Sequence, residues 1–417
     1  MENILIVIFI LGYISITLEH SLKIDKLIPA LVMMVLMWAV ISLGHFNIYT
    51  IDEELKMLVP SNLNETLLHH FGKTAEILIF LVGAMTIVEI IDHFDGFSAI
   101  KGFVKTNSKR KLIWVFCIIG FFLSSVIDNL TATIILISIL RKIVKSGELR
   151  FWYASLIVIA ANAGGAWSPI GDVTTTMLWI ANKVTAVNLI VALFIPSVVS
   201  IFVPAFIASF LPIFKGNLEH IVIENEEKSS KYGNVMFYLG LGGIVFVPIF
   251  KTITHLPPYL GMMFSLAIVA IVAEILSIKK LEFTTLENEK SHISPIHKSL
   301  SRIEMPSVLF FLGILMAVAA LESVGKLFQF SDWLTVTIPN IDVVVLILGF
   351  SSAIIDNVPL VAASMGMFQE PIDSYLWHFI AYSAGTGGSM LIIGSAAGVV
   401  AMGMEKINFF WYLKNIA

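Results

Sequence analysis

Long, predominantly apolar runs constrain this chain more than any other feature. Leu27–Leu43, Ala75–Ile91, Leu189–Phe210 and Val235–Phe250 approach or exceed the length needed to cross ~30 Å of hydrocarbon at about 1.5 Å per residue. Hydrophobic residues make up 57% of the chain and charged residues 13%, which would give a soluble protein far too much apolar surface. The sequence therefore predicts an all-α polytopic protein of the lipid bilayer, with about ten apolar segments.

Charge and cysteine content exclude other classes of function. The formal net charge of −4 offers no basic surface, so we expect no nucleic-acid partner. Cys117 is the only cysteine and cannot form a disulfide within the chain. Because it lies in an apolar run, it is expected to be a small core residue rather than a redox or metal site.

One short polar phrase occurs twice, each time inside an apolar stretch. The first reads Ser-Ser-Val-Ile-Asp-Asn and ends at Asp128-Asn129, and the second reads Ser-Ser-Ala-Ile-Ile-Asp-Asn and ends at Asp356-Asn357. A carboxylate inside a membrane is costly and normally faces a bundle interior or an aqueous cavity. Each Asp-Asn pair is therefore a candidate functional site, and the repetition indicates a duplicated ion pathway.

The charges around the first phrase predict a re-entrant hairpin. Basic residues flank it on both sides, at 109–111 and at 141–150, and basic loops concentrate on the cytoplasmic side of membranes. Two half-helices of ~14 residues, each ~21 Å long, are too short to span but can enter and leave on that side. We therefore predict a hairpin over 112–145 with Asp128 near its tip. A single bent crossing is the alternative.

The second phrase has acidic flanks, which predicts the opposite orientation. Asp332 and Asp342 precede it, and Glu370 and Asp373 follow it. We therefore predict a second re-entrant hairpin, over 342–370, that opens to the outside. The two halves are then inverted repeats, an arrangement typical of secondary transporters that work by alternating access.

A glycine-rich break follows each predicted hairpin. The first, Asn162–Asp172, contains Gly-Gly, Pro and Gly-Asp, and the second, from Ser383, contains Gly-Thr-Gly-Gly-Ser and then Gly-Ser. Glycine and proline interrupt a helix and free backbone groups to bind an ion. We predict the following organisation: first repeat 1–212 with broken helix 151–180, cytoplasmic linker 213–234, and second repeat 235–417 with broken helix 374–403 and a truncated closing helix.

The polar side chains at the hairpin tips and breaks suit a small hard cation, because they are carboxylate, amide and hydroxyl oxygens. The tips and breaks contain no Arg, Lys or His, which disfavours an anionic substrate. The candidates for proton and cation exchange are Asp128, Asp172, Asp356 and Glu89. The candidate neutral ligands are Asn129, Thr131, Asn162, Thr174, Thr175, Asn357 and Ser389. Direct contacts to the cation are expected from Asp128, Asn129, Asp172, Asp356 and Asn357.

Two longer phrases carry a resemblance to a known family. Phe121–Thr133 and Ala160–Thr176 resemble the signature regions of NhaD-type sodium/proton antiporters of the ion transporter superfamily. The resemblance covers nearly the whole chain. It implies a homodimer in a bacterial cytoplasmic membrane that exchanges Na⁺, and Li⁺ too, for H⁺. No cofactor and no enzymatic activity are expected.

Two alternative functions remain open. The first is arsenite or dicarboxylate transport within the same superfamily. The lack of basic side chains at the two hairpin tips argues against it. The second is an intramembrane aspartyl protease, since Gly171-Asp172 faintly resembles the Gly-Asp pair of those enzymes, with Asp128 or Asp356 as its partner. A protease has no need of an inverted duplication.

Overall fold

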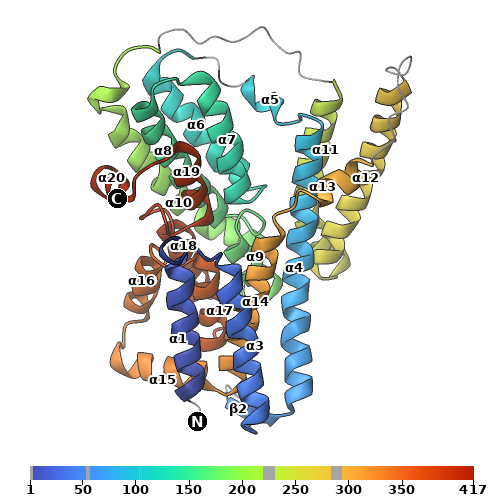
Figure 1. The fold of residues 1–417 in the computed structure, drawn as a ribbon, viewed down its shortest axis with the longest axis vertical. Helices are drawn as coiled ribbons and strands as arrows, with labels where there is room; N and C mark the ends of the chain where they lie inside the picture. The colour runs from blue at the N-terminus through green and yellow to red at the C-terminus, as the bar shows by residue number, and fades with distance from the viewer. Residues whose placement is uncertain (1–2, 53–56, 103, 105, 219–230, 283–293) are drawn as a thin grey trace.

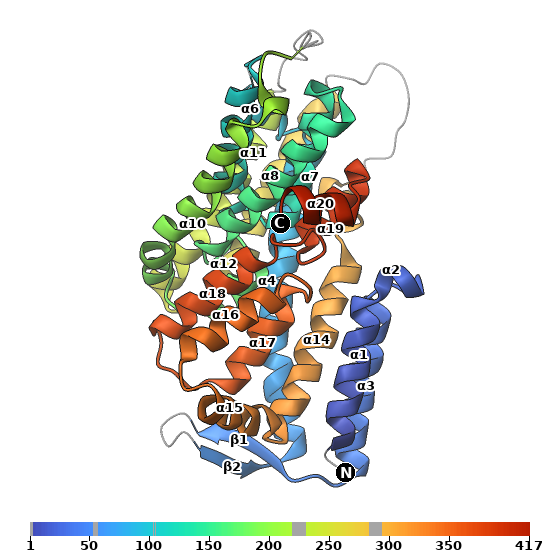
Figure 2. The ribbon, with the colours of Figure 1, turned by 90° about the vertical axis from the view of Figure 1, so that its left-hand side faces the viewer.

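The computed structural model describes residues 3–52, 57–102, 104, 106–218, 231–282 and 294–417. It is almost entirely helical, as predicted (Figure 1). The exception is a small antiparallel pair, β1 (Ile48–Asp52) and β2 (Met57–Ser61), which Figure 2 shows at the lower end of the molecule. The sequence analysis did not predict this pair. Most of the predicted linker, 219–230, lies outside the described residues.

The first part of the chain forms these helices: α1 (Asn3–Thr17), α2 (Glu19–Leu22), α3 (Leu27–Leu43), α4 (Leu63–His93), α5 (Ser98–Lys101), α6 (Lys109–Ser124), α7 (Asn129–Ile143), α8 (Gly147–Ala166), α9 (Val173–Ile180) and α10 (Ala186–Ser209). The second part forms η1 (Pro212–Phe214), α11 (Lys231–Thr254), α12 (Pro258–Glu282), α13 (Pro295–Leu300), α14 (Met305–Ser323), α15 (Lys326–Thr337), α16 (Ile341–Ser351), α17 (Asn357–Met367), α18 (Tyr375–Gly387), α19 (Ala396–Glu405) and α20 (Phe409–Asn415).

Five of the described helices are long and apolar enough to cross a membrane: α4, α10, α11, α12 and α14. The expectation of about ten apolar segments was too high if each is counted as a full crossing. The remaining apolar stretches are divided into shorter helices, because polar or glycine-rich breaks interrupt them. The chain is thus a multi-pass membrane protein in which long helices stand beside broken ones.

Each break ends at a side chain that caps the next helix. The Asp128 carboxylate accepts a hydrogen bond from the Thr131 N–H at the start of α7, and Asp356 caps α17 in the same way. Asp172 caps α9, and Ser395 caps α19. A capping oxygen satisfies the free N–H groups of a helix start, so the chain can begin a helix in the interior. The sequence thus places a polar side chain at four internal helix ends.

In each half, serine and glycine contacts join two helices. The helix that precedes the Asp-Asn pair, α6 or α16, packs against the helix before the glycine-rich break, α8 or α18. The Ser124 hydroxyl donates to the Ala161 carbonyl at 2.6 Å, and the Ser352 hydroxyl donates to the Ala384 carbonyl at 2.8 Å. A Cβ at Gly164 would overlap a carbonyl oxygen of α6, and a Cβ at Gly387 would overlap one of α16. Both helix pairs therefore need glycine for their close approach, and the same contacts recur in the two halves.

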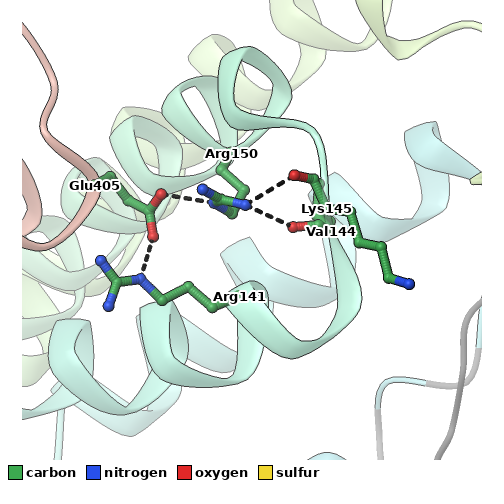
Figure 3. Close-up of polar contacts among 5 residues, drawn as sticks. All are labelled: Arg141, Val144, Lys145, Arg150 and Glu405. Atoms are coloured by element: carbon green, nitrogen blue, oxygen red, sulfur yellow. Dashed lines mark hydrogen bonds and ion pairs between the residues drawn. The ribbon is translucent and has the colours of Figure 1, made fainter.

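A buried carboxylate fixes the end of α19 against α7 and α8 (Figure 3). The side chain of Glu405 is 0% exposed and accepts from the Nε atoms of Arg141 and Arg150, each at 2.7 Å. Arg150 also donates to the carbonyls of Val144 and Lys145. The two arginines thus join the last turn of α19 to the end of α7 and the start of α8.

An aspartate of the second half, Asp373, joins the start of α18 to the start of α10. Asp373, before α18, accepts from the N–H and hydroxyl of Thr185 at 2.7 and 2.9 Å and from the Asn188 amide at 2.8 Å. Burial raises the pKa of this carboxyl group, but these hydrogen bonds to its charged form outweigh burial and hold the pKa below its ordinary value. Asp373 is thereby kept ionised as a fixed anchor for the start of α10.

Candidate cation site

A cavity of about 70 Å³ lies where the two phrases and the first break meet. Since one water molecule needs about 10–15 Å³, the cavity has room for several waters or a partly hydrated ion. The polar side chains among the described residues that line it are Lys26, Asp128, Asn129, Asp172, Thr176, Glu304, Ser307, Asp356 and Asn357. The structure therefore brings the two Asp-Asn pairs together with Asp172.

Asp172 holds the centre of this arrangement. The residue is 3% exposed, and its Oδ2 atom accepts from the amide groups of Asn129 at 3.4 Å and Asn357 at 3.1 Å. Its Oδ1 atom accepts from the Thr174 N–H at 3.3 Å, as the cap of α9. One amide from each repeated phrase thus meets at a single buried carboxylate.

A second layer of hydrogen bonds orients the Asn129 amide. Asn129 donates to Asn162 Oδ1 at 2.9 Å, and Asn162 donates to the Ser395 hydroxyl at 3.0 Å. Sequence reasoning missed Ser395. The available signal was the Gly394-Ser395 pair, which stands in the second break where Gly171-Asp172 stands in the first. The site is therefore asymmetric, with a carboxylate at one break and a hydroxyl at the other.

The two aspartates of the repeated phrases have different partners. Thr131 donates twice to Asp128, with its N–H to Oδ1 at 2.8 Å and its hydroxyl to Oδ2 at 2.7 Å. Asp356 instead forms an ion pair with Lys26, at 3.4 Å between Nζ and Oδ2. Sequence reasoning missed Lys26, because it lies at the start of α3, far from both phrases. The hairpin tips themselves contain no basic side chain, but Lys26 reaches the cavity from another part of the fold.

The three aspartates line one cavity without forming one carboxylate cluster. Across the part of the chain that the structure describes, no three His, Cys, Asp or Glu side chains lie close enough to hold a metal ion. A cation in this cavity would therefore take at most two carboxylates and complete its coordination with neutral oxygens. The Asn129 and Asn357 side chains can supply these, because turning an amide replaces its NH₂ group by its oxygen.

Comparisons with known proteins show the family of this chain. The family model described as citrate transporter (CitMHS) matches residues 6–381. Sodium/proton antiporter 2 from Arabidopsis thaliana is 40% identical over 98% of this chain and 94% of its own length, and sodium/proton antiporter 1 from the same plant is 42% identical over 98% and 68%. The Na⁺/H⁺ antiporter NhaD of Alkalimonas amylolytica is 31% identical over 98% and 86%. The chain belongs to the NhaD-type antiporters of the citrate transporter family.

The predicted family is thus confirmed, and a solved structure agrees with the fold of this NhaD-type antiporter. The YdaH transporter of Alcanivorax borkumensis, whose crystal structure is described as having an unusual topology, superposes with a TM-score of 0.57. The match covers 93% of this chain and 92% of that one, at 12% identity. It therefore supports the helical membrane fold alone.

Four of the other predicted residues of the NhaD-type antiporter, Thr174, Thr175, Ser389 and Glu89, are not among the described residues that line the cavity. The Thr175 hydroxyl donates to the Asp172 carbonyl at 3.0 Å, while the buried Thr174 hydroxyl has no hydrogen-bond partner among the described residues. The Ser389 hydroxyl donates to the Thr386 carbonyl at 2.7 Å. Neither Ser389 nor Glu89 is among the described residues that line the cavity. The structure therefore does not bring these two to Asp172.

Proposed function

We propose that this NhaD-type antiporter exchanges Na⁺, and Li⁺ as well, for H⁺ by alternating access. The observation that carries the proposal is the Asp172 carboxylate, 3% exposed, with an amide from each phrase on one of its oxygens. A buried carboxylate is stabilised by a proton or by a bound cation, and the two compete. Competition at one carboxylate is enough to couple the two flows.

The charges of the cavity favour a cation over an anionic substrate. The described lining residues include four acidic side chains, Asp128, Asp172, Glu304 and Asp356, and one basic side chain, Lys26. The excess of carboxylates repels an anion such as a dicarboxylate. This argues against the related alternative of dicarboxylate transport, although the family model is named for citrate.

The hydrogen bonds at Asp172 also favour transport over proteolysis. An aspartyl protease needs two carboxyl groups that share a proton, so that one can act as base while the other acts as acid. Asp172 is contacted by the amides of Asn129 and Asn357, and Asp128 is contacted by Thr131. These neutral partners suit a cation site.

Exchange can be measured in everted membrane vesicles with a pH-sensitive dye. Adding Na⁺ or Li⁺ after respiration has acidified the vesicles is expected to dissipate the pH gradient, with less response to K⁺. Because protons compete for the same carboxylate, we expect the activity to rise from neutral to alkaline pH. The absence of a response to both Na⁺ and Li⁺ at every pH in this range would refute the proposed function.

The proposal includes the inverted arrangement of the two phrases in the membrane. Figures 1 and 2 place α6–α8 toward one end of the molecule and α16–α18 toward the other. The α6–α8 segment and its loops contain basic residues such as Arg141, and the α16–α18 segment and its loops contain acidic residues such as Asp373, so we assign the first end to the cytoplasm of a bacterial cell.

A cysteine-labelling experiment tests this topology. With the buried Cys117 as the only native thiol, a cysteine at Ser146 is expected to react with a membrane-impermeant reagent only in inside-out vesicles. A cysteine at Gln369 is expected to react only in intact cells. Labelling of both positions from one side would contradict the inverted topology.

The proposal also includes a homodimer that works without a cofactor, as the family resemblance implies. Light scattering of the purified protein in detergent, with the detergent contribution subtracted, is expected to give twice the mass of the 46.0 kDa chain. A mass equal to that of one chain would contradict the dimer.

A further inference from the structure

The two repeated phrases differ at the third residue after the aspartate. In the first it is Thr131, whose N–H and hydroxyl both donate to Asp128, at 2.8 and 2.7 Å. In the second it is Pro359, which has neither an N–H nor a hydroxyl group to donate. Asp356 receives one N–H, from Val358 at 3.3 Å, so its other oxygen lacks the partner that Thr131 provides in the first phrase.

Lys26 supplies the missing partner from another part of the fold. Its Nζ atom lies 3.4 Å from Asp356 Oδ2 and 4.5 Å from the centre of the Phe310 ring. The ring face attracts a cation, so the ammonium group is held from two sides. Lys26 directly precedes α3 and Phe310 belongs to α14, whereas Asp356 is the cap of α17. The ion pair therefore bridges the second phrase and helices outside it.

The ammonium group of Lys26 lines the same cavity as Asp172. An ammonium group and a sodium ion are alternative partners for one carboxylate, and two positive charges at short distance repel each other. We propose that Lys26 is an internal cation that occupies Asp356 while the cavity is empty and is displaced when Na⁺ binds beside Asp356. This inference rests on the proposed function for its transport consequences, but its binding step stands by itself.

The released ammonium group has other acidic neighbours. Asp25 precedes it in the sequence, and Glu304 lines the same cavity. Lys26 can therefore stay charged after Asp356 has turned to the sodium ion. Its role is to set the affinity for Na⁺, because every bound Na⁺ has to replace an existing ion pair.

The test compares three variants in two assays. Lys26→Met removes the charge, Lys26→Arg keeps it, and Lys23→Met removes an exposed positive charge from the same segment. We expect Lys26→Met to lower the apparent KM of exchange for Na⁺ about three- to tenfold, Lys26→Arg to lower it less than Lys26→Met does because the charge remains, and Lys23→Met to leave it within about twofold of the unmodified protein. Equilibrium binding of ²²Na⁺ to the purified protein is expected to shift in the same way.

The binding assay separates this inference from the proposed function. If the unmodified protein binds Na⁺ without exchanging it, the proposed function fails, and the change in binding on Lys26→Met still decides the role of Lys26. An unchanged or weakened affinity in Lys26→Met overturns the inference, as does a protein that binds no Na⁺ at all.

A chemical rescue guards against a variant that folds poorly. Lys26→Cys, modified in the assembled protein with an aminoethyl thiosulfonate, regains a positive charge, whereas a methyl thiosulfonate leaves it neutral. The buried Cys117 is the only other thiol, and the unmodified protein serves as its control. We expect tighter Na⁺ binding with the methyl group and a return to the original affinity with the aminoethyl group. Equal affinity with both reagents also overturns the inference.

Discussion

Asp172→Asn is expected to abolish Na⁺-dependent proton exchange while the protein still inserts and folds. Asparagine has nearly the size of aspartate, and its oxygen can still accept from the amides of Asn129 and Asn357. It cannot take up a proton or carry a negative charge. We expect the exchange rate to fall at least about 100-fold, equivalent to about 2.8 kcal/mol.

The measurement is dye-monitored exchange in everted vesicles, with equal amounts of membrane-inserted protein. Asp92→Asn serves as the matched control, because it removes an exposed carboxylate from α4, away from the cavity lining. It is expected to keep normal exchange. Normal activity with an unchanged pH profile in Asp172→Asn would remove this carboxylate from the mechanism.

Asp128→Asn tests the first repeated phrase in the same assay. Asparagine is as good a helix cap as aspartate, so α7 is expected to form as before. Loss of exchange in this variant therefore reports the charge rather than the cap. If exchange continues in Asp128→Asn but stops in Asp172→Asn, then the charge of Asp128 is not needed for exchange and that of Asp172 is.

The double variant Arg141→Ala, Arg150→Ala is expected to destabilise the protein by about 3 kcal/mol. It leaves the Glu405 carboxylate, which is 0% exposed, without a cationic partner. We take the lower end of the range for breaking a buried ion pair, because the arginine side chains are themselves 44% and 25% exposed. Thermal unfolding in detergent measures the effect.

Adding Glu405→Gln to the double variant is expected to restore part of the lost stability, since the uncompensated buried charge is then removed. Lys142→Ala is the matched control, because it removes an exposed positive charge from the same end of α7. A double variant that unfolds at the temperature of the unmodified protein would show that the cluster contributes little to stability.

The sequence alone indicated a membrane fold and most of the site. A carboxylate inside an apolar run is too costly to be accidental, so each Asp-Asn pair was visible as a functional position. The glycine-rich breaks were visible because glycine and proline interrupt helices. Asp172 followed from both signals together, and the structure places it between Asn129 and Asn357.

The number of full crossings could not be read from hydrophobicity. The sequence suggested about ten segments, but five described helices are long enough to span. Hydrophobicity indicates that a segment is removed from water, but not how long its helix is. A short apolar helix has the same composition as a part of a long one, so the two cannot be told apart. Where a helix ends depends on capping contacts such as those of Asp172 and Ser395.

Only the tertiary structure revealed the ionic partners. Lys26 meets Asp356 across 330 positions of the sequence, and Arg141 meets Glu405 across 264. A charged side chain near a helix end carries no local pattern that indicates which distant helix it will contact. The site aspartates were therefore predictable, because the free-energy cost of burying a carboxylate marks each of them in the sequence. Lys26 was not predictable, because only the packing of the helices brings it to its partner Asp356.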